Sequence, residues 1–140
     1  MIVGYQERAE ILCKQFPREH FTRGFSLNYL IEGHSKVLAT VKEEVIALTG
    51  FANGGFLVTL GDAAAVYAAM SLVPEGHTKL LQTSFHFCSP AHLGMKLRAD
   101  ANVIKETGYI IWISATISNA ENNELIAFGD MMFKKPSKRS

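Results

Sequence analysis

The chain has 140 residues, of which 48% are apolar and 19% are charged. This length and composition predict one domain over residues 1–140 with enough apolar side chains for a buried core, and they exclude a disordered chain. The net charge of +1 gives no strong field for binding nucleic acid or an anionic membrane. We interpret the single run of like charge, at residues 134–139, as a basic, solubilising C-terminal tail.

Two cysteines, Cys13 and Cys88, make no disulfide framework and have no metal-like spacing, so we expect a cytoplasmic protein. Cys88 ends a strand-like run and is expected to be a small buried side chain. The five histidines show no paired zinc-ligand spacing. No phosphate-binding loop, dinucleotide fingerprint or serine-hydrolase elbow occurs in the sequence. We therefore expect no metal and no resident cofactor.

The first part of the chain predicts a short amphipathic helix at Val3–Phe16, which Pro17 ends. Two strands follow, at Phe25–Ile31 and Lys36–Lys42, and Gly33-His34-Ser35 has the composition of the turn between them. The segment Glu43–Ala52 is expected to be a loop.

A long helix is predicted at Gly54–Leu72, where alanines are frequent and polar side chains are few. Because this helix is apolar nearly all round, it must be buried on most sides. Asp62 near its middle argues against a membrane span, at a cost of about 3 kcal/mol in lipid. The turn residues Pro74-Glu75-Gly76 end the helix. Only strands follow, at residues 79–87, from residue 96 onward, at 109–118 and at 125–133. The sequence predicts an α+β domain with an antiparallel sheet.

The start of the long helix contains the residues best suited to chemistry. Gly54 and Gly55 leave backbone N–H groups uncovered in the first turn, where the helix dipole helps them to polarise a carbonyl or stabilise an oxyanion. Asp62 is a carboxylate in apolar surroundings and could act as a nucleophile or a general base. The alternatives are structural. Asn53 could be only an N-cap, the glycines only a tight helix entry, and Asp62 a satisfied core group or a solvent-facing one.

From Phe25 to Phe133 the chain resembles the PaaI-like branch of the hot-dog thioesterases. Four features carry this resemblance: Gly54-Gly55 at the helix start, Asp62 at the family spacing, Ser84-Phe85-His86-Phe87-Cys88-Ser89-Pro90-Ala91 as a strand ending in an aromatic-x-x-Pro-Ala turn, and Gly94-Met95-Lys96-Leu97 starting the next strand. The resemblance implies a hot-dog fold, in which an antiparallel sheet wraps around one long central helix. It also implies homodimers or homotetramers built as dimers of dimers, and acyl-CoA substrates.

The resemblance also assigns roles. Asp62 matches the catalytic carboxylate and Gly54 the glycine whose N–H contacts the thioester carbonyl, with Asn53 beside it. Candidate substrate-binding residues are Gly55, Tyr67 (from its place five residues after Asp62), Leu80 and Ser89. The sequence departs from the family pattern at three places. Asn53 replaces a histidine, Ala47 replaces an asparagine or glutamine, and Leu80 aligns with a polar residue that holds water.

Geometry adds a conditional expectation about the oligomer. Gly54 and Asp62 lie eight residues apart, or about 12 Å along one helix, whereas both would need to lie about 3 Å from the same reacting centre. If both act, one must come from a second chain, and a two-fold dimer then has two equal composite sites. The expected activity is acyl-CoA hydrolysis. A non-catalytic acyl-CoA-binding protein is the alternative, and a hydratase is disfavoured because no suitably spaced aspartate–histidine pair occurs.

Overall fold

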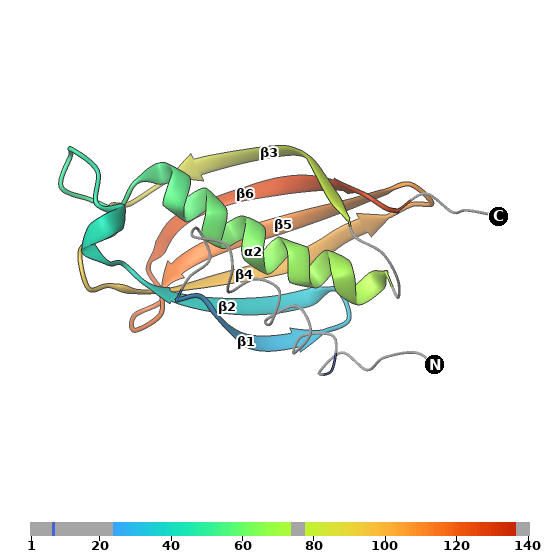
Figure 1. Ribbon diagram of the computed structural model, residues 1–140, viewed down its shortest axis with the longest axis horizontal. Coiled ribbons are helices and arrows are strands. Elements are labelled where there is room, and N and C mark those ends of the chain that lie inside the picture. Colours follow the sequence, from blue (N-terminus) through green and yellow to red (C-terminus); the bar gives the residue numbers. More distant parts are fainter. Residues whose placement is uncertain (1–6, 8–23, 74–77, 137–140) are drawn as a thin grey trace.

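The computed structural model describes Glu7, residues 24–73 and residues 78–136. The helix expected at Val3–Phe16 lies outside these described residues, apart from Glu7. The turn Pro74-Glu75-Gly76, expected to end the long helix, lies within the undescribed residues 74–77, and the end of the basic tail lies outside the described residues as well. Within them, six strands form one antiparallel sheet and a single long helix lies across it (Figure 1). This is the hot-dog fold, and the α+β prediction is confirmed.

The elements follow one another as β1 (Ser26–Ile31), β2 (His34–Thr40), a 3-10 turn η3 (Glu43–Val45), helix α2 (Gly54–Leu72), β3 (Lys79–Phe87), β4 (Lys96–Glu106), β5 (Ile110–Asn119) and β6 (Leu125–Lys134). The strand order in the sheet is β1-β2-β4-β5-β6-β3. Strands β1 and β3 are therefore its two edges, although β3 follows the helix directly in the chain.

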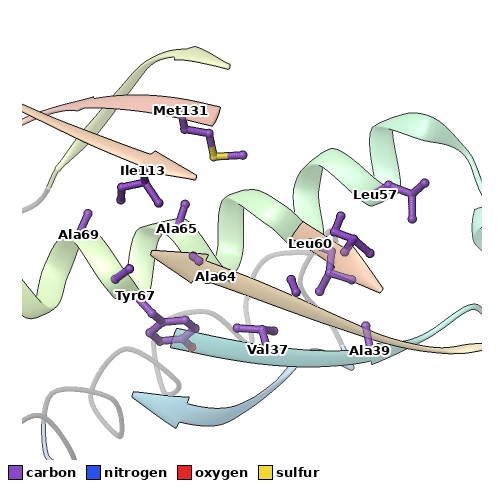
Figure 2. Close-up of a cluster of buried hydrophobic side chains, with 14 of the residues drawn as sticks. Val37, Ala39, Leu57, Leu60, Ala64, Ala65, Tyr67, Ala69, Ile113 and Met131 are labelled. Atoms are coloured by element: carbon purple, nitrogen blue, oxygen red, sulfur yellow. The ribbon is translucent and has the colours of Figure 1, made fainter. Parts of the chain in front are cut away.

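The core lies between α2 and the sheet. Side chains on β4 and β5 alternate between buried and accessible, so one face of each strand is turned to the helix. Ala65 on the helix points towards Ile113 on β5 and Met131 on β6, whereas Val37 on β2 lies on the opposite side of the helix from these two residues (Figure 2). Small alanines on α2 allow the helix to approach the sheet closely.

Two serines tie the helix to the first hairpin. Ser35 Oγ donates to the Ala64 carbonyl, and Gly33 N–H donates to Ser71 Oγ over 2.7 Å. Ser71 Oγ in turn donates to the Ala68 carbonyl, also over 2.7 Å. These bonds satisfy polar groups that would otherwise be costly in an apolar interior.

The first hairpin corrects one expectation. The turn is Glu32-Gly33 rather than Gly33-His34-Ser35, because Ile31 already pairs with His34 across the two strands. Gly33 is the second central residue of this turn and has a positive φ of 74°, a conformation that favours glycine there. Ser35 is consequently a strand residue and is fully buried against the helix.

Helix α2 is long and apolar enough, by length and composition, to cross a membrane. In this fold 61% of its apolar window is buried inside the protein. A core helix enclosed by a curved sheet accounts for that hydropathy without a membrane.

Candidate active site

Asn53 caps helix α2. Its backbone is extended (φ −62°, ψ 137°), and its Oδ1 accepts a hydrogen bond of 2.6 Å from Gly55 N–H. Its own N–H donates to the Val45 carbonyl over 2.7 Å, which fastens the helix start to η3. The Gly55 amide is therefore occupied by the cap and is not available to a ligand in this conformation.

The neighbouring amide is different. Gly54 N–H makes no hydrogen bond to any residue that the structure describes. It lies at the positive end of a 19-residue helix and points out of its first turn. A Cβ at Gly54 would lie 3.3 Å from Cζ of Phe87, so this ring flanks the amide. An acceptor oxygen placed here would meet an unused donor beside an aromatic wall.

Asp62 lies two turns farther along α2. It shares one helix face with Gly55, Thr59 and Val66, which is the least buried face of α2. The carboxylate is half-buried, and its Oδ1 atom is shielded from solvent. A carboxylate that is partly desolvated yet lies on an accessible face has the surroundings of a base or nucleophile.

One chain does not bring Gly54 and Asp62 together. Eight residues along a continuous helix separate them by about 12 Å. Both groups lie on helix α2 as the sequence predicts, but a site that uses both needs a second copy of the chain.

Tyr67 is not placed beside Asp62. Five residues of helix turn its side chain by about 140° from that of Asp62, and the ring points towards β2 (Figure 2). Tyr67 is only 6% exposed and belongs to the hydrophobic core. The side chain therefore supports the packing of the helix rather than the accessible face of α2.

The other sequence candidates lie along β3 and the segments that flank the helix. Leu80 is an exposed residue of β3, and Ser89 is half-buried, with its N–H donating to the Ile126 carbonyl. Ala47 forms part of a turn in which its N–H donates to the Phe51 carbonyl. Cys88 is exposed rather than buried, because it follows an edge strand that no other described strand covers.

Sequence reasoning missed the role of Phe87. Phe85 and Phe87 both face α2 from β3, and their rings lie over Gly61 and Gly54 respectively. The sequence carried a signal for this packing. Gly54 and Gly61 are seven residues apart and so lie on nearly the same face of the helix, and Phe85 and Phe87 lie on one face of the strand. Pairing those two patterns requires knowing that β3 lies beside that face.

Comparisons with known proteins identify the family and the fold. The sequence profile of the thioesterase superfamily matches residues 49–126, which include the helix start, Asp62 and β3. No curated protein matches the chain significantly.

Solved structures share the fold at low sequence identity. The Escherichia coli PaaI protein from the phenylacetic acid degradation operon has a TM-score of 0.85 and 18% identity, with 98% of this chain and 97% of that chain covered. Mouse thioesterase superfamily member 2 has a TM-score of 0.84 and 20% identity, covering 97% and 100%. The smu.793 protein of Streptococcus mutans, solved with acetyl-CoA, has a TM-score of 0.78 and 21% identity, covering 88% and 97%.

These structural matches support the fold, and the profile match covers more than half of the sequence. The chain belongs to the thioesterase superfamily.

Proposed function

We propose that the protein hydrolyses acyl-CoA thioesters to a free acid and CoA at a site between two copies of the chain. The observation that carries this proposal is the Gly54 N–H, a donor at the start of a long helix with no hydrogen bond to a described residue. Such a donor is suited to the negative charge that develops on a thioester carbonyl oxygen during attack. The S. mutans neighbour was solved with acetyl-CoA, which is consistent with a CoA ligand.

In the proposed reaction, the Gly54 amide and the helix dipole polarise the carbonyl of the bound thioester. Asp62 of the partner subunit then removes a proton from water, and the resulting hydroxide forms a bond to the carbonyl carbon. The carbon–sulfur bond breaks, the thiolate of CoA leaves and takes up the proton, and the acid remains. In a second version, a carboxylate oxygen of Asp62 forms a bond to the carbonyl carbon, the carbon–sulfur bond breaks and the CoA thiolate leaves. Water then cleaves the resulting mixed anhydride, which releases the acid, regenerates the Asp62 carboxylate and supplies the proton that the thiolate takes up. Both versions need no cofactor beyond the CoA of the substrate.

Strand β3 supports the dimer that this reaction needs. It is a nine-residue edge strand on which every side chain except that of Phe85 is exposed. Leu81 and Phe87 are 49% and 54% exposed. A long, exposed edge strand presents unpaired backbone groups along one side and is a template for pairing with another strand. A second copy added along β3 about a two-fold axis would place both helices on the same side of a continued sheet. Two such dimers could associate further.

Non-catalytic acyl-CoA binding remains the second candidate, and three positions favour it. Asn53 is engaged as a helix cap, Ala47 has no polar side chain, and Leu80 is an exposed apolar residue where a water-holding group would help hydrolysis. Loss of such groups lowers turnover more than it lowers binding.

Thiol release from an acyl-CoA panel separates the two candidates. We expect turnover by the natural protein and a loss of about 10²–10⁴-fold in Asp62→Asn, the usual contribution of a general base. Asp130→Asn is the matched control, because Asp130 is an exposed carboxylate on β6. Tight binding without release in the natural protein would establish the binding function instead. Release that survives Asp62→Asn would exclude this carboxylate.

A mixing experiment tests the composite site. Gly54→Pro removes the N–H donor, and Asp62→Asn removes the base, so each variant alone should be inactive. In an equal mixture, half of the dimers are mixed and each retains one intact site, giving roughly a quarter of the natural activity. A mixture that stays inactive, although mass spectrometry detects mixed dimers, would show that the two groups do not act across subunits.

A further inference from the structure

A cavity of about 910 Å³ adjoins the start of helix α2 on the side away from β3. Its walls come from the residues just before β1, from the end of β2, from η3 and its neighbours in the chain, and from the start of α2. The hydrogen bond from Asn53 N–H to the Val45 carbonyl joins the wall formed by η3 to the wall formed by the start of α2. The volume is near the upper end of the range for small-molecule sites.

The interior of the cavity is mainly apolar. Phe25, Val45, Ile46 and Phe56 line it, and the rings of Phe25 and Phe56 meet edge to face with centroids 5.8 Å apart. The two charged lining residues, Lys42 and Glu44, are exposed and of opposite sign. The lining thus offers no net charge to an ionised ligand group and a large surface to an apolar one.

The cavity is next to the proposed carbonyl site. Asn53 and Gly55, which flank Gly54 in the chain, both line it. Thr59, one turn beyond Gly55, extends the wall along the helix and donates its hydroxyl to the Gly55 carbonyl over 2.8 Å. A thioester whose carbonyl accepts from Gly54 N–H therefore has one of its two arms beside this opening.

We infer that the cavity holds the acyl arm, and that the substrates carry uncharged, apolar acyl groups longer than acetyl. The inference rests on the proposed function, because that function places the thioester at Gly54. The pantetheine arm of CoA carries amides that would lose hydrogen bonds to water among Phe25, Ile46 and Phe56. An alkyl or aryl acyl group gains free energy from the same burial.

Binding of CoA analogues that cannot be hydrolysed tests this assignment. S-(2-oxopropyl)-CoA and S-(2-oxodecyl)-CoA retain a carbonyl and differ only in the length of the apolar arm. For the natural protein we expect the long analogue to bind at least about 30-fold more tightly, since each buried methylene contributes about fourfold. Val45→Trp places a large ring in the wall of the cavity and obstructs it. This variant should reduce the preference to about threefold or less, while the affinity for the short analogue changes by less than about threefold.

Two further variants guard the interpretation. Thr40→Trp narrows the same cavity from the end of β2 and should act in the same direction if Val45→Trp fails to fold. Thr116→Trp places the same bulk on an exposed threonine of β5 that does not line the cavity, and it should keep the 30-fold preference. An equal loss of affinity for both analogues in the cavity variants would assign the cavity to the CoA arm and overturn the inference. An unchanged preference would also overturn it.

Failure of hydrolysis and failure of this inference give different results. In one outcome the protein releases no thiol, but it prefers the long analogue and Val45→Trp removes that preference. This result would contradict the proposed hydrolysis and support the assignment of the cavity to the acyl arm. In the opposite outcome the protein releases thiol, but Val45→Trp and Thr40→Trp leave its preference for the long analogue unchanged. This result would support the proposed hydrolysis and contradict the cavity assignment.

Discussion

Gly54 and Gly61 lie on nearly the same face of α2, beneath two phenylalanines of β3, yet their surroundings differ. Gly61 is buried, and a Cβ on it would lie 2.6 Å from Cζ of Phe85, which is closer than van der Waals contact allows. A Cβ on Gly54 would lie 3.3 Å from Cζ of Phe87, a residue that is 54% exposed. One glycine is required by packing, whereas the other leaves space around an available amide.

The difference shows what distinguishes a packing glycine from a functional one. A glycine inside a helix costs about 1 kcal/mol relative to alanine, so each position needs a compensating advantage. At Gly61 the advantage is close contact with Phe85, whose ring also lies against Gly129. At Gly54 the amide has no acceptor among the described residues and contact with the ring is looser. The backbone N–H is the distinctive property there.

Among changes that test this comparison of the two glycines, the largest expected effect comes from removing that N–H while keeping the helix. Proline is well tolerated at the first helical position, and Asn53 already has the extended backbone (φ −62°, ψ 137°) that a following proline requires. We expect Gly54→Pro to lower kcat by about 10²–10³-fold, as for loss of one oxyanion donor. Gly54→Ala keeps the N–H and brings a Cβ to the same ring, so it should lose less than about tenfold.

Thiol-release kinetics and thermal unfolding of both variants measure this difference. Equal activity of the proline and alanine variants, with both folded, would contradict a role for the Gly54 amide. The proposed reaction would then need another donor for the carbonyl oxygen.

The second prediction concerns Gly61. Gly61→Ala should lower the free energy of unfolding by about 2 kcal/mol, because overpacking against the held Phe85 ring exceeds the gain in helix propensity. Urea unfolding measures the loss. Adding Phe85→Leu should remove the clash, so that the double variant is more stable than the sum of the two single changes predicts. Simple additivity would show that the ring moves aside freely, and Gly61 would then not be a packing glycine.

Local sequence patterns predicted much of the fold. The bounds of α2 and β3 agree with prediction residue for residue, because an alanine-rich apolar run after Asn53 and a strand-like run ending before Cys88-Ser89-Pro90 are determined by neighbouring residues. The order of these elements predicted an α+β domain, and the family resemblance implied the hot-dog arrangement. The structure confirms both.

Properties that depend on distant contacts were not predictable in the same way. Placing β3 at a sheet edge depends on its pairing with β6, and this pairing leaves Cys88 exposed rather than buried. Ser35 is buried because α2 presents the Ala64 carbonyl above it. Tyr67 follows Asp62 closely in sequence but points into the core on another side of the helix. Similarly, the different surroundings of Gly54 and Gly61 become visible only once β3 is in place.

A third prediction tests how firmly the far end of the helix is held. Ser71 Oγ accepts from Gly33 N–H and donates to the Ala68 carbonyl, so Ser71→Ala leaves the partly buried Gly33 amide without its acceptor. We expect a loss of about 1.5 kcal/mol in unfolding free energy and no change in kcat. Ser114→Ala is the control, because its hydroxyl makes only a 3.5 Å contact with the Asn102 carbonyl. A fall in kcat for folded Ser71→Ala would show that the two ends of α2 are not independent.

The smallest expected effect separates capping from catalysis at Asn53. Asn53→Ala loses the bond to Gly55 N–H and should cost about 1 kcal/mol of stability, with little change in activity per folded molecule. Asn53→Asp retains a capping oxygen and should preserve stability. It also places a negative charge beside the Gly54 amide, where the oxyanion is proposed to form, and should lower kcat by about tenfold. Urea unfolding and thiol release together measure both effects. Full activity of Asn53→Asp would mean that little negative charge develops near Gly54, and the helix start would then serve binding rather than catalysis.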